Sequence, residues 1–177
     1  MLEQDKKYKC GLAVMRVQPF HNGHKFLIDG MLDESDIAVV AIGSSQESDT
    51  VENPFSYDFR RECISLTYPV EVKQGKLRII GIEDIFNSGK WVEHVLTQVQ
   101  KQLGLSPDVY ICGGVDNGKY FQDENMRVKN FKRDTNDHIS GTEIRELIKN
   151  PAMPLLNTHL PFGTRKMLEQ IRCKLVA

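Results

Sequence analysis

Short apolar runs alternate with helix-like segments along the first 150 residues, and this alternation restricts the possible fold more than any other feature of the chain. An apolar run of about four to eight residues is typical of a buried strand, whereas apolar residues three and four apart are typical of a helix. Strands are expected at residues 11–17, 37–42, 77–82, 109–112 and 126–131, and helices at residues 26–32, 56–67, 88–103, 116–123 and 140–149. Strands that alternate with helices favour a parallel sheet with right-handed crossovers. We therefore expect an α/β fold built on a doubly wound parallel sheet.

The pattern changes at the first of the late prolines. Three prolines punctuate a loop over residues 151–161, and the apolar spacing over residues 162–175 predicts a terminal helix. A chain of 177 residues is long enough for one well-buried core and short for two. We therefore expect a single domain over residues 1–177, with an α/β core at 1–150 and a helical C-terminal appendage at 151–177.

Charge and cysteine content argue against several classes of function. The formal net charge of -1 gives no general affinity for nucleic acid or for an anionic membrane, which usually requires a basic face. The four cysteines are widely spaced and form no Cys-x-x-Cys pair, which argues against a zinc site or a disulfide framework. The N-terminal segment lacks an apolar signal core, and no apolar run approaches membrane-spanning length. We expect a cytoplasmic protein with reduced thiols that binds neither nucleic acid nor a membrane.

The junction between the first expected strand and the first expected helix has the residues of an anion site. It reads QPFHNGH over residues 18–24. Asn22 can cap the helix, Gly23 lets the backbone approach a ligand, and the amides of the first helical turn favour an anion. His21 and His24 can both direct ring donors at such an anion. Two histidines that merely close a loop against solvent are the simpler alternative, so support is needed from elsewhere in the chain.

That support comes from the segment ISGTEIR at residues 139–145. Ser140 and Glu143 are spaced as a capping box, which by itself predicts only a well-capped helix. The same turn, however, also contains a second hydroxyl, a glycine and Arg145, which can donate two hydrogen bonds to a phosphate. Two such anion sites in one small domain suit a nucleoside triphosphate.

A third phosphate-binding pattern, GGVDNGKY at residues 113–120, differs by one residue from a P-loop and follows an expected strand. A P-loop needs Ser or Thr at its last position to hold magnesium, and Tyr120 does not fill that role. No apolar strand that ends in aspartate supplies the usual partner either. The pattern therefore disfavours an ATPase or kinase of the P-loop class.

These motifs resemble those of the nucleotidyltransferase superfamily, whose signatures are H-x-G-H and a late I-S-x-T-x-x-R, and most of all those of the archaeal-type nicotinamide mononucleotide adenylyltransferases. The segments AIGSSQ, NPF and KWVEH agree in the same order, so the likeness spans residues 11 to about 150. The resemblance implies a Rossmann-like nucleotidyltransferase fold. It also implies an enzyme that joins ATP and nicotinamide mononucleotide to give NAD and pyrophosphate, with Mg²⁺ accompanying ATP and a homo-oligomer as the assembly.

The resemblance further implies which residues form the site. The expected catalytic residues are His21, His24 and Arg145. The expected ATP- and phosphate-binding residues are Arg16, Gly23, Gly113, Gly114, Ser140, Gly141 and Thr142. The expected nicotinamide-nucleotide site consists of Gly43, Ser44, Pro54, Phe55 and Trp91, with this single tryptophan stacked on the nicotinamide ring. No protein ligand for a metal is expected, because no carboxylate cluster in the sequence resembles a dedicated metal cage.

Two positions depart from the family pattern. Glu52 stands where the archaeal-type enzymes usually have a basic residue that faces the substrate's phosphate, and Met15 stands where a glycine commonly precedes the arginine. Because Glu52 would repel a mononucleotide phosphate, another phosphorylated acceptor such as phosphopantetheine, or a CTP-dependent reaction, stays open as an alternative. A nucleotide sensor without turnover is a further alternative, against which the intact His21, His24 and Arg145 argue.

Overall fold

The computed structural model describes residues 7–113, 115–124, 126–131, 140–150 and 156–176. Within these residues, five parallel strands form one sheet in the order β3-β2-β1-β4-β5. The strands are β1 (Tyr8–Met15), β2 (Ser35–Ile42), β3 (Leu77–Gly81), β4 (Val109–Cys112) and β5 (Arg127–Asn130). The strand order reverses at β1, which is the point where ligands bind in open parallel sheets of this kind. The expected doubly wound parallel sheet is confirmed.

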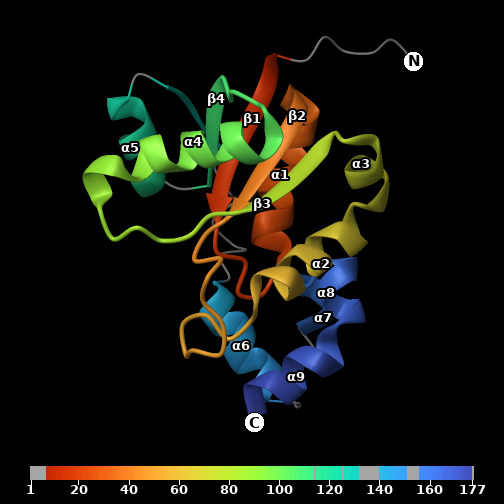
Figure 1. The fold of residues 1–177 in the computed structure, drawn as a ribbon. Helices are drawn as coiled ribbons and strands as arrows, with labels where there is room; N and C mark the ends of the chain where they lie inside the picture. Colours follow the sequence, from red (N-terminus) through yellow and green to blue (C-terminus); the bar gives the residue numbers. More distant parts are fainter. Residues whose placement is uncertain (1–6, 114, 125, 132–139, 151–155, 177) are drawn as a thin grey trace.

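Helices pack on both faces of the sheet, as Figure 1 shows. They are α1 (Asn22–Glu34), α2 (Tyr57–Thr67), α3 (Pro69–Gln74), α4 (Trp91–Leu103), α5 (Val115–Asp123), α6 (Gly141–Lys149), α7 (Leu156–His159), α8 (Phe162–Lys166) and α9 (Leu168–Val176), with a 3₁₀ turn η1 at Ser88–Lys90. One buried apolar cluster joins α1 and α2 to the sheet, for example through Met31 and Ile64. A second joins α4 and α5 to the other face through Val95 and Phe121. Strands covered on both faces explain the continuous apolar runs in the sequence.

Several element boundaries differ from those expected. β1 ends at Met15, because Val17 adopts a left-handed backbone (φ 58°) that no strand can continue. The cap of α1 is His21 and not Asn22. α4 begins at Trp91, after the 3₁₀ turn that contains Ser88, so Ser88 is not its cap. The end of β1 and the starts of α1 and α4 are thus set by turns of the backbone, which the spacing of apolar side chains does not predict.

The C-terminal region also differs in detail. The helix expected over residues 162–175 is divided at Met167 into α8 and α9, and a short α7 precedes them. These helices lie with α6 and α2 at one end of the sheet (Figure 1), where α6 contacts α9 and α8 contacts α2. A third apolar cluster, which includes Phe55, Ile148 and Ile171, holds them together. The helical C-terminal appendage is therefore confirmed as a layer packed against the strand ends.

Three hydrogen bonds connect this C-terminal layer to α2 and to the loop that begins α1. The buried Thr164 hydroxyl donates to the carbonyl of Phe20 at 2.7 Å, and the side-chain amide of Asn22 donates to the carbonyl of Thr158 at 2.6 Å. The amide of Gly163 donates to the hydroxyl of Thr67 at 3.0 Å. The C-terminal layer therefore fixes the residue on each side of His21.

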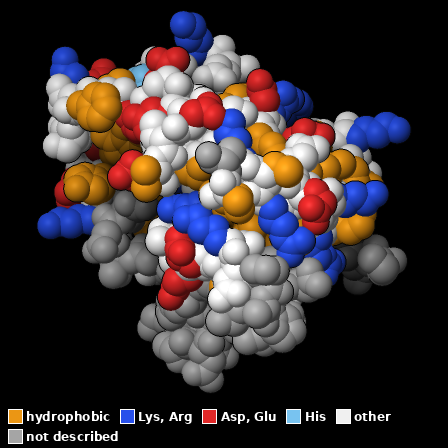
Figure 2. All heavy atoms as spheres, turned by 90° about the horizontal axis from the view of Figure 1, so that it is seen from below, with side chains coloured by type: hydrophobic (Ala, Val, Ile, Leu, Met, Phe, Trp, Pro, Cys, Tyr) orange, Lys and Arg blue, Asp and Glu red, His pale blue; other side chains and the backbone are white. Residues whose placement is uncertain are grey.

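Basic, acidic and apolar side chains are interspersed on the described surface seen in Figure 2. This mixed pattern differs from the continuous basic face that usually binds a phosphodiester backbone. Among the described helices, none has the length and apolar character needed to cross a membrane. All four cysteines lie in the described residues as free thiols, three of them buried.

We predict that Gly163→Ala destabilises the protein by about 1–3 kcal/mol, the usual cost of overpacking a close contact. A Cβ atom at this position would overlap the backbone carbonyl of Cys63 on α2, so α8 would have to move away from α2. Urea unfolding followed by circular dichroism measures the effect. Gly89→Ala is the matched control, because the nearest atom to its added carbon lies 3.6 Å away. Equal stability of the two variants would contradict the close packing of α8 on α2.

Candidate active site

Arg60 links the carboxyl ends of β1 and β2. Its side chain is only 1% exposed, and its guanidinium donates to the carbonyls of Arg16 and Gly43 at 2.8 Å and of Ser44 at 3.0 Å. Burial lowers the pKa of Arg60 to about 10, against which the negative charge of Asp84 acts most strongly, so the group stays charged at neutral pH. A buried arginine needs such acceptors, because an unpaired buried charge is very costly. Arg60 therefore determines how the two strand ends are spaced.

The two histidines are oriented by the start of α1. The amide of Gly23 donates to Nδ1 of His21 at 3.1 Å, and the amide of His21 donates to Nδ1 of His24 at 3.4 Å. This is a capping box made by two imidazoles, whose ring centroids lie 3.8 Å apart. Because both Nδ1 atoms accept, the neutral rings carry their proton on Nε2. Each ring is thus arranged as a donor through Nε2.

The N-terminus of α6 lies directly against this loop. Arg145 donates to the carbonyl of Gln18 at 2.7 Å and to the hydroxyl of Thr142 at 3.2 Å. Gly141 is required here, since a Cβ atom would come within 2.7 Å of the Gln18 carbonyl oxygen. The expected capping box is confirmed, with Ser140 accepting from the amide of Glu143 and its own amide donating to that carboxylate. The H-x-G-H and I-S-x-T-x-x-R motifs therefore meet in space.

A cavity of about 220 Å³, the histidine cavity, opens where the motifs meet. Its polar lining includes Arg16, His21, His24, Glu52, Thr142 and Arg145. Desolvation lowers the pKa of Arg145, while the charges of Glu146 and Glu52 raise it. Five of these six side chains are cationic or can donate a hydrogen bond, and the sixth is a carboxylate. Together with a helix N-terminus, the five donors make this cavity suitable for a polyanion.

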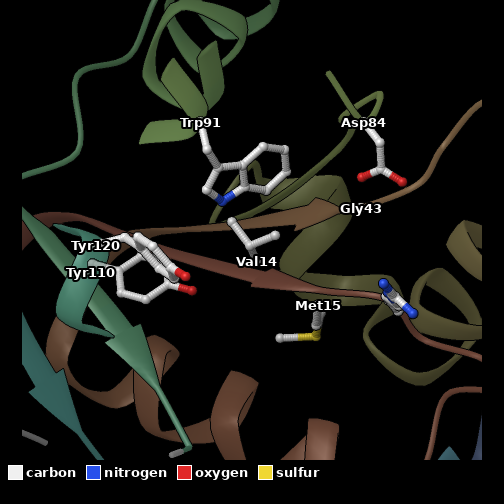
Figure 3. Close-up of a pocket in the computed structure, with 8 residues that line it drawn as sticks. Val14, Met15, Gly43, Asp84, Trp91, Tyr110 and Tyr120 are labelled. Carbon is white, nitrogen blue, oxygen red and sulfur yellow. The ribbon is translucent and has the colours of Figure 1, made fainter. Parts of the chain in front are cut away.

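A second cavity of about 250 Å³, the tryptophan cavity, lies beside it. Its lining includes Arg16, Gly43, Asp84, Trp91, Tyr110 and Tyr120. In Figure 3, Trp91 projects from α4 over the strand ends, Asp84 descends from the loop after β3, and the tyrosine hydroxyls face the same space. Because Arg16 lines both cavities, the two adjoin at the end of β1. A ligand that spans both would have its polyanionic part at the histidines and an aromatic part at Trp91.

The other residues expected in the site have more varied places. Ser44 is buried with a left-handed backbone (φ 49°), and its carbonyl is held by Arg60. Pro54 and Phe55 are buried, and Phe55 stacks on Phe59 in the core beneath the C-terminal helices. Gly113 directly follows β4, while Gly114 lies outside the described residues. The amide of Gly23 is engaged by the His21 ring.

Three residues important for the geometry were not identified from the sequence: Gln18, Arg60 and Asp84. The buried side chain of Gln18 accepts from the amide of Phe55 at 3.0 Å and donates to its carbonyl at 3.1 Å. Arg60 had a usable signal, because it stands on the same helical face as Cys63 and Ile64, where an apolar residue would be ordinary. Asp84 had none, since its role depends on the path of a loop.

No group of three or more metal-ligating side chains that could hold a metal ion is found within the described residues. The histidine cavity offers the single carboxylate of Glu52 and otherwise donors. Its side chains therefore suit an anion that brings its own cation, and they do not form a resident metal cage.

Comparison with known proteins agrees with this geometry. Residues 16–147 match the cytidylyltransferase-like family. A nicotinamide-nucleotide adenylyltransferase of Thermoplasma acidophilum is 30% identical over 143 residues, which cover 81% of this chain and 76% of that protein. Another, of Archaeoglobus fulgidus, is 32% identical over 140 residues and covers 75% of each chain. The chain belongs to the cytidylyltransferase-like family of nucleotidyltransferases, within which these archaeal adenylyltransferases are its relatives.

Solved structures show the same fold. A bifunctional NMN adenylyltransferase/ADP ribose pyrophosphatase of Francisella tularensis superposes with a TM-score of 0.76 at 21% identity and covers 96% of this chain. The same protein in complex with AMP and a manganese ion gives a TM-score of 0.74. The chain spans about half of that bifunctional protein, 52% of its length.

We predict that Arg60→Met lowers the free energy of unfolding by about 3 kcal/mol or more, since the carbonyls of Arg16, Gly43 and Ser44 would each lose a charged donor at about 1 kcal/mol or more apiece. Arg61→Met is the matched control, because the neighbouring Arg61 is exposed and its loss should change stability by no more than about 0.5 kcal/mol. Chemical denaturation of both variants measures the difference. Similar midpoints for the two would show that Arg60 does not hold the strand ends.

Proposed function

We propose that this chain transfers the adenylyl group of ATP to nicotinamide mononucleotide, which forms NAD and releases pyrophosphate. The observation that carries the proposal is the pair of adjoining cavities, one suited to a triphosphate and the other to a cationic aromatic ring. Its relatives of the same family, which are about 30% identical, are nicotinamide-nucleotide adenylyltransferases. Cytoplasmic location and homo-oligomeric assembly stay predictions.

In the proposed reaction an oxygen of the mononucleotide's 5′-phosphate attacks the α-phosphorus of ATP. A new P–O bond forms as the bond from the α-phosphorus to the oxygen it shares with the β-phosphorus breaks, and pyrophosphate leaves with that electron pair. The attacking phosphate is already ionised at neutral pH, so the reaction needs no protein nucleophile. The protein's contribution is to hold the two reactants in line and to stabilise charge that develops on the leaving group.

The histidine cavity is arranged for that contribution. We assign the Nε2 donors of His21 and His24 to the triphosphate and its transition state, because the capping box orients both rings in advance. Arg145 and Arg16, which line this cavity, are assigned to the departing pyrophosphate. Thr142 in the same lining and Ser140, the cap of α6, are assigned to phosphate anchoring. Arg16 lies in both cavities and is therefore placed to contact both reactants.

A divalent cation, Mg²⁺ in this proposal, would arrive with ATP and neutralise part of the triphosphate charge. The donor set described above fits this arrangement, because the cation would keep phosphate oxygens and water as its ligands. Glu52 is the carboxylate in the lining of the histidine cavity, and so the side chain there that could contact the cation. Its position beside Arg145 also lowers the positive potential of that cavity.

The function is tested by measuring pyrophosphate release from ATP and Mg²⁺ with a panel of acceptors. Nicotinamide mononucleotide is expected to support turnover, whereas phosphopantetheine and the replacement of ATP by CTP are expected to give much less. Turnover with phosphopantetheine alone would move the acceptor away from pyridine nucleotides. Tight ATP binding without pyrophosphate release under any of these conditions would favour a nucleotide sensor.

We predict that His24→Ala lowers turnover by roughly 100-fold, which is the scale for losing one positioned transition-state donor. Initial rates of pyrophosphate release at saturating substrates measure this loss. His159→Ala serves as the control, because this histidine lies on α7 and lines neither cavity. A near-normal rate for His24→Ala would remove His24 from the catalytic group, and a collapse of its melting temperature would assign it a structural role as a cap.

We predict that Trp91→Ala raises the KM for nicotinamide mononucleotide by roughly tenfold while the KM for ATP changes little, because the indole would lose stacking and cation–π contact with the pyridinium. In the wild-type protein the mononucleotide should quench the fluorescence of this single tryptophan. Phe86→Ala is the matched aromatic control, since Phe86 is 90% exposed and lines neither cavity. Equal changes in both KM values would indicate that Trp91 only packs the core.

A further inference from the structure

Asp84 is the acidic residue in the lining of the tryptophan cavity. In Figure 3 the Asp84 carboxylate and the Trp91 indole project toward the same space from the same side of the strand ends, and Asp84 is half-buried. Aromatic faces combined with a carboxylate are a suitable environment for a cationic ring. The neighbouring tyrosines, Tyr110 and Tyr120, add aromatic surface and hydroxyls. Among the described residues that line this cavity, Asp84 supplies the carboxylate.

Two arginines oppose that charge. Arg16 lines the same cavity, and Arg60 lies buried behind it with its guanidinium on the carbonyls of Arg16 and Gly43. Asp84 and Arg60 interact electrostatically, because the negative charge of Asp84 is the largest influence that raises the pKa of Arg60 against burial. Glu47 acts on Arg60 in the same direction but less strongly. Among the described residues that line the tryptophan cavity, Asp84 is therefore the one that opposes the positive charge of the two arginines.

The backbone around Asp84 is held on both sides. The amide of Asp84 donates to the side-chain oxygen of Gln46 at 3.1 Å, which ties it to the loop after β2. The ring of His94 on α4 donates through Nε2 to the carbonyl of Glu83 at 3.1 Å. The backbone that carries Asp84 therefore does not have to be ordered when a ligand binds, which favours discrimination between ligands at this position.

We propose that Asp84 is a specificity-determining residue that makes the enzyme prefer the nicotinamide form of the mononucleotide over the nicotinate form; this inference rests on the proposed function. The base of the nicotinamide form carries a net charge of +1, whereas the base of the nicotinate form is a zwitterion with no net charge. A nearby carboxylate attracts the first through its net charge. It gains less from the second, because the nicotinate carboxylate offsets the attraction of the pyridinium and repels Asp84 when it faces that residue. The two arginines would favour the nicotinate carboxylate if Asp84 were neutral.

The test compares kcat/KM for nicotinamide mononucleotide and for nicotinic acid mononucleotide, with ATP and Mg²⁺ in excess, in three proteins. They are the wild type, Asp84→Asn, and Glu83→Gln as a matched control that removes the same charge from an exposed neighbour. Wild type and Glu83→Gln are expected to prefer the nicotinamide form to the same extent. In Asp84→Asn the ratio should fall about tenfold, a modest effect because the site is partly solvated. Asp84→Ser, which removes the charge with a smaller side chain, should shift the ratio in the same direction.

Each result decides between the possibilities. The inference would be overturned if the ratio of the two kcat/KM values were unchanged in both Asp84 variants, or if it fell equally in Glu83→Gln. The proposed function would still stand in these cases, because the proteins would still turn over nicotinamide mononucleotide. A wild-type preference for the nicotinate form would overturn it as well. Absence of turnover with either mononucleotide would overturn the proposed function and this inference together. Loss of kcat/KM in equal proportion for both mononucleotides would assign Asp84 to loop structure and not to specificity.

Discussion

The hydrogen bonds from the buried Arg60 guanidinium to three backbone carbonyls are the interaction on which the site most depends. They join the ends of β1 and β2, next to the point between β1 and β4 where the strand order reverses. The backbone on both sides of these carbonyls is strained, since Val17 and Ser44 have left-handed φ angles of 58° and 49°. Non-glycine residues in this region cost about 1–3 kcal/mol each and persist only when their surroundings impose them. Arg60 supplies that constraint.

The strained strand ends have a direct use. After Met15 the chain leaves the sheet at Arg16 and turns toward the motif at residues 18–24. Arg16 can therefore face both cavities. A regular strand would continue in the plane of the sheet and would not bring the motif at residues 18–24 over to α6. The buried Arg60 guanidinium therefore keeps the sheet closely packed and also holds open the end of the sheet where two ligands can meet. Asp84, which lies close enough to influence Arg60, places an opposite charge at that end.

The fold followed from the sequence because it depends on periodicity. Apolar runs such as 37–42 and 109–112 were recognisable as strands since both of their faces are buried, and the α6 capping box was recognisable from Ser140 and Glu143. The two signature motifs were linked because two anion sites in one small domain suit a single triphosphate, and the family resemblance then agreed. Local spacing could not show their contact, because 127 positions separate Gln18 and Arg145, which are in contact. Long-range pairs of this kind leave no local pattern.

What the sequence did not reveal consists mainly of side chains that bond backbone groups. The cap of α1 is the ring of His21 and not the side chain of Asn22. The histidine Nδ1 accepts a hydrogen bond from the backbone amide of Gly23, as a carboxylate oxygen could. Gln18 bonds the backbone of Phe55, which lies 37 positions further along the chain, beyond α1 and β2. Such contacts depend on where loops run, and helical or strand periodicity carries no information about that.

The C-terminal layer has a consequence for the order in which the site is completed. Thr164 bonds the residue before His21, and Lys174 on α9 forms an ion pair with Asp49 in the loop that carries Glu52. All five strands are translated before either of these partners. A nascent chain in which α8 and α9 are still inside the ribosome can therefore assemble its sheet while residues 18–24 and the 44–54 loop lack their outer supports. Substrate binding is then expected to follow the emergence of α9 from the ribosome, so helices made after the sheet complete a site that begins with residues 18–24.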